Sequence, residues 1–121
     1  VALYLDRLRR DGVRMCVASA TALPLMKACL DRLGVLDYFD FLLSCEEVGW
    51  GKDRPDVYHE AARRLGASPR EIAVYEDALG AAKTAKMAGY YVVAVYDGGT
   101  QPWEELKKLA DEAIDNWKEE I

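Results

Sequence analysis

Two adjacent carboxylates, Glu76 and Asp77, are the residues of this 121-residue chain that most clearly suggest chemistry. They end a short apolar run at residues 72–75, which is predicted to be a buried strand. A single carboxylate there would be explained as a helix cap that the helix macrodipole stabilises. Two neighbouring negative charges repel each other unless a cation or hydrogen-bond donors compensate them. Because Mg²⁺ prefers hard oxygen ligands, the pair predicts a magnesium site.

A hydroxyl group follows another predicted strand, at residues 13–18. Ser19 stands at its end, next to Ala20 and Thr21, where the following helix begins. Backbone N–H groups in the first turn of a helix suit an anion, and the Ser19 hydroxyl would add a donor. Taken alone, Ser19 or Thr21 is better explained as a helix cap.

A lysine occupies a loop between two glycines, at residues 49–56. Most lysines are solvated surface residues, and this explanation is favoured for Lys52 by itself. Glycines on both sides nevertheless allow the backbone to approach a ligand closely, and Pro55 restricts the direction of the chain as it enters a helix. A lysine held in such a loop could neutralise a phosphoryl group.

The elements that must position these residues alternate between strands and helices. Predicted strands occupy residues 13–18, 40–45, 72–75 and 91–96, with a short edge strand at 113–114; predicted helices occupy 1–10, 22–33, 55–65, 78–88 and 103–112. Strands that are apolar throughout are typical of sheets with helices on both faces. The pattern therefore predicts an α/β fold with a doubly wound, mostly parallel sheet, in which ligands bind beyond the carboxyl ends of the strands.

Composition excludes several classes of function. The chain is 51% hydrophobic and long enough for one domain. Its net charge of -5, without clusters of basic and aromatic residues, argues against nucleic acid as a partner. No apolar run reaches the roughly 20 residues of a membrane helix, and the three cysteines form no C-x-x-C pair. We therefore expect a cytoplasmic protein with no membrane partner.

In chain order, Ser19, Lys52 and the Glu76–Asp77 pair resemble motifs two, three and four of the haloacid dehalogenase superfamily. The resemblance covers nearly the whole chain. Residues 51–58, G-K-D-R-P-D-V-Y, are similar to the G-K-P-x-P-D-hydrophobic-[FY] pattern of the subgroup that contains phosphoglycolate phosphatases and β-phosphoglucomutases. Residues 75–80, Y-E-D-A-L-G, resemble its E-D-S-x-x-G pattern. The chain departs from these patterns at Asp53 and Ala78.

The resemblance implies a role for each of these residues. Ser19 would hydrogen-bond the transferring phosphoryl group together with the backbone N–H of Ala20, and Lys52 would stabilise its charge. Asp77 and Glu76 would hold Mg²⁺ directly or through water. The implied substrate is a small phosphorylated metabolite, and the implied reaction is that of a phosphatase or a phosphomutase.

The family's first motif, D-x-D-G-[TS], supplies the nucleophile and the general acid and base, and it does not precede residue 13. The partial imitation at residues 96–100, Y-D-G-G-T, is interpreted as a turn. In the family the motif-one strand lies centrally, between the strands that end at Ser19 and Glu76. We therefore expect residues 1–121 to be the C-terminal portion of a core domain, incomplete without that central strand and without a cap.

That expectation names the missing N-terminal segment of the same protein as a partner and predicts that this chain alone is inactive. The complete enzyme would act through an aspartyl-phosphate intermediate. Two alternatives remain open: a non-catalytic binding scaffold with the same fold, and a receiver-like signalling domain. The order of the Ser, Lys and acidic residues disfavours the receiver. His59 is expected to lie at the surface or half-buried, and Trp50 is a candidate to border the substrate.

Overall fold

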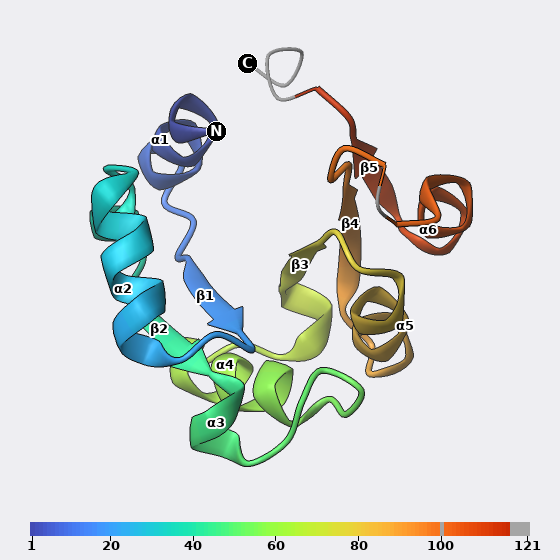
Figure 1. The fold of residues 1–121 in the computed structure, drawn as a ribbon, viewed down its shortest axis with the longest axis horizontal. Coiled ribbons are helices and arrows are strands. Elements are labelled where there is room, and N and C mark those ends of the chain that lie inside the picture. Colours follow the sequence, from blue (N-terminus) through green and yellow to red (C-terminus); the bar gives the residue numbers. More distant parts are fainter. Residues whose placement is uncertain (100, 117–121) are drawn as a thin grey trace.

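The computed structural model describes residues 1–99 and 101–116 (Figure 1). Its helices and strands alternate along the chain as predicted. Its elements are, in order, α1 (Ala2–Arg10), β1 (Cys16–Ser19), α2 (Leu23–Arg32), η1 (Leu36–Tyr38), β2 (Phe41–Ser44), α3 (Cys45–Val48), α4 (Asp56–Leu65), η2 (Pro69–Glu71), β3 (Ala73–Glu76), α5 (Leu79–Met87), β4 (Tyr91–Val95), α6 (Trp103–Leu109) and β5 (Glu112–Ile114). Among the described residues no helix is both long and apolar enough to cross a membrane.

The strands form two parallel sheets. One contains β1 and β2, and the other has the strand order β3-β4-β5. Ser19 lies opposite Ser44 in the first sheet, and Glu76 lies opposite Ala94 in the second. Figure 1 shows β1 and β3 as the inner strands, with α2 beyond one sheet and α5 and α6 beyond the other. The predicted α/β fold with parallel strands and an incomplete sheet is confirmed, and within the described residues β1 and β3 are not paired with each other.

The core is built where helices pack against the strands. Helix α4 contacts β1 and β2, while α5 contacts β3, β4 and α6. The largest fully buried side chains include Leu43 of β2, Val57 of α4, Val92 of β4 and Leu106 of α6. The second sheet and α4 therefore pack together in the core next to the carboxyl end of β3, where Glu76 and Asp77 lie.

Several predicted boundaries were wrong. The first strand begins at Cys16 rather than at residue 13, because Arg14 turns outward to Asp40, with 2.8 Å between Nε and Oδ2. The last helix ends at Leu109, and the backbone then returns to pair with β4. The predicted edge strand at residues 113–114 is confirmed as part of β5.

Helix α2 buries less of its apolar face than its spacing predicts. Met26 is its one buried residue, whereas Leu25 of the same helix is 66% exposed. Leu33, just after the helix, is also 66% exposed. The helix packs mainly against β2 and η1, and Leu25 and Leu33 remain exposed in the described part of the chain.

We predict that Leu43→Ala lowers the free energy of unfolding by about 2–5 kcal/mol, because the substitution leaves a cavity at a fully buried position. Leu33→Ala is the matched control and should change it by less than about 0.5 kcal/mol, since that side chain is exposed. Urea unfolding of the two variants measures both values. Equal losses would show that Leu43 is not in the core.

Candidate active site

The carboxylate of Glu76 is the centre of the candidate site. Its side chain is only 6% exposed, and both of its oxygens accept hydrogen bonds. Lys52 Nζ lies 3.0 Å from Oε2, and the hydroxyl of Tyr58 donates to the same oxygen at 3.2 Å. The backbone N–H groups of Asp77 and Ala78 donate to Oε1 at 3.1 and 3.3 Å. A buried negative charge is tolerated only with such compensation.

Short-range structure brings Lys52 to this carboxylate. Helix α3, which the sequence did not predict, begins with a capping box in which Ser44 Oγ accepts from the N–H of Glu46 at 3.2 Å. The Glu47 side chain accepts from the N–H of Ser44 in return, at 2.8 Å. Gly49 ends the helix with a φ of 86°, a left-handed conformation that favours glycine. The chain thus turns directly from β2 into the loop that carries Lys52.

The two carboxylates differ in their electrostatic environment. Burial acts to raise the pKa of Glu76, but the charge and hydrogen bond of Lys52, with further hydrogen bonds at Asp77 and Ala78, hold that pKa below its usual range. Partial burial raises the pKa of Asp77, and the neighbouring Glu76 carboxylate raises it further. Glu76 is therefore ionised at neutral pH. Asp77 occupies a negative environment that a cation would relieve.

The fit of these residues to Mg²⁺ follows from their donor atoms. Asp77 and Glu76 supply the hard oxygens that Mg²⁺ prefers. Both Glu76 oxygens are already engaged by donors, so Asp77 is the better placed for direct coordination. In the described part of the chain, no group of three or more His, Cys, Asp or Glu side chains could hold a metal. The chemistry of the two carboxylates fits Mg²⁺, and the magnesium site at this pair stays a prediction.

Ser19 lies at the end of β1 and is held by local contacts. Its Oγ accepts from the N–H of Thr21 at 3.1 Å, and Ser44 Oγ donates to the Thr21 carbonyl at 2.8 Å. Ala22 is the N-cap of α2, which has no side-chain cap, so neither Ser19 nor Thr21 caps this helix. The described hydrogen bonds do not join Ser19 directly to Lys52. Its phosphate-binding role, with Ala20, stays a prediction.

Two side chains that support the site, Tyr58 and Gln101, could not be identified from the sequence pattern. Tyr58 lies in the motif around Lys52, but nothing in the pattern shows that its hydroxyl reaches Glu76. Gln101 accepts from the N–H of Leu79 at 3.2 Å through its Oε1 and so holds the start of α5. Both contacts join segments that are far apart in the sequence.

The predicted turn at residues 96–100, His59 and Trp50 lie outside the group around Glu76. Gly98 and Gly99 have φ values of 97° and 101°, and Asp97 Oδ1 accepts from the N–H of Gly99 at 3.0 Å, so the predicted turn is confirmed. Thr100, its last residue, lies outside the described residues. His59 is exposed, as expected. Trp50 is 50% exposed, and the Arg54 guanidinium carbon lies 3.9 Å from the centre of its ring.

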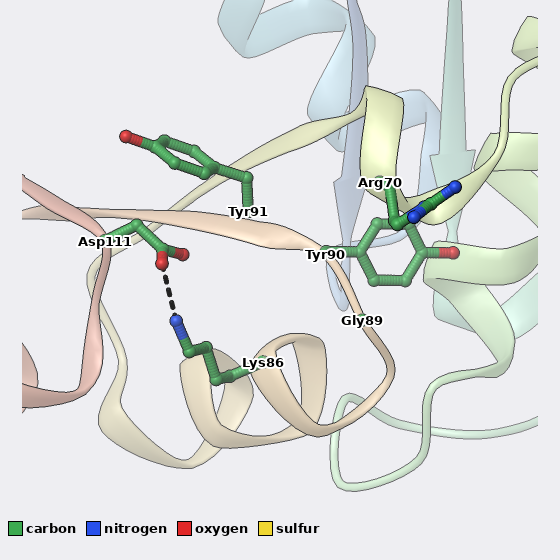
Figure 2. Close-up of a pocket in the computed structure, with 6 residues that line it drawn as sticks. All are labelled: Arg70, Lys86, Gly89, Tyr90, Tyr91 and Asp111. Carbon is green, nitrogen blue, oxygen red and sulfur yellow. Dashed lines mark hydrogen bonds and ion pairs between the residues drawn. The ribbon is translucent and has the colours of Figure 1, made fainter.

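A hollow at the amino end of β4 lies away from the candidate site. Figure 2 shows Lys86 of α5 reaching Asp111, with 2.6 Å between Nζ and Oδ1, while Arg70 and Tyr90 lie on the other side of the hollow. Asp111 Oδ2 also accepts from the N–H of Val92 at 2.8 Å. These contacts fasten the segment before β5 to β4, which is a structural role.

The parallel strands and the helices beside them define an α/β protein. Its lysine and two carboxylates lie beyond the end of a strand, where a ligand with both an anion and a cation would fit. The chain belongs to the haloacid dehalogenase-like hydrolase family, whose family model matches residues 1–89. The predicted family and its subgroup of phosphatases and β-phosphoglucomutases are confirmed by this match and by the relatives described next.

Two curated relatives are similar in sequence. Protein CbbY of Cereibacter sphaeroides is 31% identical, with 98% of this chain and 52% of the relative covered. Hexitol phosphatase B of Escherichia coli K12 is 32% identical, with 71% of this chain and 40% of the relative covered. The chain thus spans about half the length of these relatives or less.

Solved structures show the same fold. The crystal structure of CbbY from Rhodobacter sphaeroides in complex with phosphate has a TM-score of 0.83 at 30% identity and covers 95% of this chain and 52% of that one. The β-phosphoglucomutase of Clostridium difficile has a TM-score of 0.78 at 22% identity over 94% of this chain and 48% of that one. The second likeness concerns the fold alone.

We predict that Lys52→Ala lowers the free energy of unfolding by about 3 kcal/mol, because it leaves the buried Glu76 carboxylate without its cation. The matched control is Lys86→Ala, which removes a lysine that is 37% exposed from the Asp111 ion pair. That control should cost no more than about 1 kcal/mol. Urea unfolding at pH 7 measures both, and similar losses would contradict the buried charge pair.

Proposed function

We propose that this chain supplies the phosphate- and metal-binding part of a Mg²⁺-dependent phosphatase or phosphomutase that acts on a small phosphorylated metabolite. The observation that carries the proposal is the 3.0 Å pair between Lys52 and the buried Glu76, directly before Asp77, in a chain of the haloacid dehalogenase-like family. Relatives named hexitol phosphatase B and fructose-1-phosphate phosphatase support the substrate class. The CbbY structure named as a complex with phosphate supports the ligand.

Lys52 would compensate the charge of the phosphoryl group. Its ammonium is paired with Glu76, and its side chain is 24% exposed, so Lys52 can face a ligand while remaining paired. Ser19 Oγ and the N–H of Ala20 would donate hydrogen bonds to phosphoryl oxygens. Donors fixed in advance stabilise charge that develops during transfer without reorganisation.

Asp77 would hold Mg²⁺ directly, with Glu76 binding directly or through water. Bound Mg²⁺ supplies charge neutralisation at the phosphoryl oxygens. Asp77 lies beside Glu76 in an environment that raises its pKa, and a cation would compensate both charges.

The nucleophile is proposed to be an aspartate on a strand that precedes residue 13 in the complete protein and lies between β1 and β3. In support, each of these inner strands is paired on one side only among the described residues, and the chain spans 52% of CbbY. Residues 1–121 would then be the C-terminal portion of the core domain. Unpaired strand edges with apolar faces are unfavourable in water, which favours an added strand.

Chemically, a carboxylate oxygen of that aspartate would attack phosphorus as the bond from phosphorus to the ester oxygen breaks. A second aspartate would give the departing oxygen its proton as general acid. Attack of water on the aspartyl phosphate would release inorganic phosphate, whereas attack of a sugar hydroxyl would complete a phosphomutase reaction. Ser19, Lys52, Glu76 and Asp77 would bind the phosphoryl group and Mg²⁺ and compensate charge in both cases.

We predict that Asp77→Asn in the complete protein abolishes Mg²⁺-supported phosphate release, because the substitution removes the anionic ligand. Lys52→Ala should lower kcat by about 10²- to 10³-fold, as expected for loss of one preorganised group that stabilises the transition state. Release of inorganic phosphate from sugar phosphates measures both.

The matched control is Asp31→Asn, an exposed aspartate of α2, which should retain the wild-type rate. Near-normal turnover by either Asp77→Asn or Lys52→Ala would argue against the proposed function.

A further inference from the structure

The phenol of Tyr58 is a buried polar group to which the proposed function gives no role. Tyr58 lies on α4 and is 5% exposed. Its hydroxyl donates to Glu76 Oε2 at 3.2 Å, the same oxygen that Lys52 Nζ approaches at 3.0 Å. Lysine and tyrosine, from the loop and from the helix that follows it, therefore share one carboxylate oxygen.

The remaining oxygen of Glu76 fixes the plane of the carboxylate. Oε1 accepts from two successive backbone N–H groups, at Asp77 and Ala78. Each oxygen thus has two donors, and rotation of the carboxylate would weaken contacts on both sides. Without the phenol, Oε2 would have Lys52 alone, so Lys52 and Glu76 could shift together.

The Tyr58 hydroxyl has a second possible acceptor, the carbonyl oxygen of Ala81 at 3.5 Å. The carboxylate is nearer and charged, and hydrogen bonds to charged acceptors are the stronger ones. An ionised carboxylate only accepts hydrogen bonds, whereas a phenol hydroxyl can donate one. The hydroxyl therefore acts as a donor to Glu76.

Packing holds the Tyr58 ring in place. The ring of Tyr90 lies 6.0 Å away, centre to centre, at an angle of 53°. The Tyr90 hydroxyl lies 2.7 Å from His59 Nδ1. Figure 2 shows that this hydroxyl points away from Lys86 and Asp111. Tyr58 and His59, which are adjacent on α4, thus connect the helix to Glu76 at one end of the sheet and to Tyr90 before β4.

We propose that Tyr58 is a positioning residue of the phosphoryl-transfer site, whose hydroxyl orients the Glu76 carboxylate and, through it, the ammonium of Lys52. This inference rests on the proposed function. The Tyr58 hydroxyl contacts Glu76 and would act through that carboxylate. Through Glu76, the Tyr58 hydroxyl would set the orientation of the Lys52 ammonium toward the phosphoryl group.

The test compares Tyr58→Phe with Tyr90→Phe in the complete protein, assayed with Mg²⁺ and a sugar phosphate. Each variant keeps its ring and loses one hydroxyl, but only the first loses a contact with Glu76. Because small displacements of a positioned group are costly, Tyr58→Phe should lower kcat by about tenfold or more, with KM changed less than about twofold. Tyr90→Phe should leave kcat within about twofold of wild type.

A second measurement separates positioning from general loss of stability. In a Lys52→Ala background, Tyr58→Phe should lower kcat by less than about twofold, since the residue acts through Lys52. A full tenfold effect in that background, a wild-type kcat for Tyr58→Phe, or an equal loss for Tyr90→Phe would overturn the inference while the wild-type protein remains active. An inactive wild-type protein would instead overturn the proposed function, and this inference with it.

Discussion

The negative charge of Glu76 lies in the interior of the protein, and the arrangement of three segments depends on its compensation. The loop after α3 contributes Lys52, α4 contributes Tyr58, and the backbone that leads into α5 contributes two N–H groups. A buried carboxylate without these donors would cost several kcal/mol. The same contacts join the half of the chain that contains β1 and β2 to the half that contains β3, β4 and β5.

This constraint also separates the roles of the two adjacent acids. Glu76 is paired and ionised, and it serves to hold Lys52. Asp77 faces the solvent-exposed side of the same turn, where neighbouring carboxylates make a negative environment. Lys52, fixed by Glu76, and the adjacent Asp77 bring a cation and a carboxylate to the end of β3. This combination suits a phosphate ester bound with Mg²⁺.

Much of the fold could be predicted from the sequence because most strands are compact apolar runs and the longer helices have a spaced apolar face. The predictions failed where a boundary depends on tertiary contacts. Arg14 shortens β1 because it binds Asp40 and the carbonyl of Leu65. The exposure of Leu25 could not be predicted, since helical spacing shows that a face exists and does not show what covers it.

The residue types of the candidate site could be predicted from the sequence, but the contacts between these residues could not. Lys52 and the Glu76–Asp77 pair were identified by position at loop and strand ends, and their contact is explained by the fold. The Tyr58 contact joins residues 18 positions apart, and no periodic pattern contains it. The short helix α3 was also missed, although Ser44 and Glu47 have the spacing of a capping box.

We propose that this chain binds the phosphoryl group and compensates its charge, while an aspartate outside this chain carries the covalent step. The most direct test is to locate the acyl phosphate by peptide mass spectrometry, after the complete protein has been incubated with a sugar phosphate and Mg²⁺ and quenched in acid. We predict one phosphorylated aspartate, at a position that precedes Val1, and no phosphate on residues 1–121. Phosphorylation of Asp77, Asp97 or any other carboxylate of this chain would show that the nucleophile lies within residues 1–121.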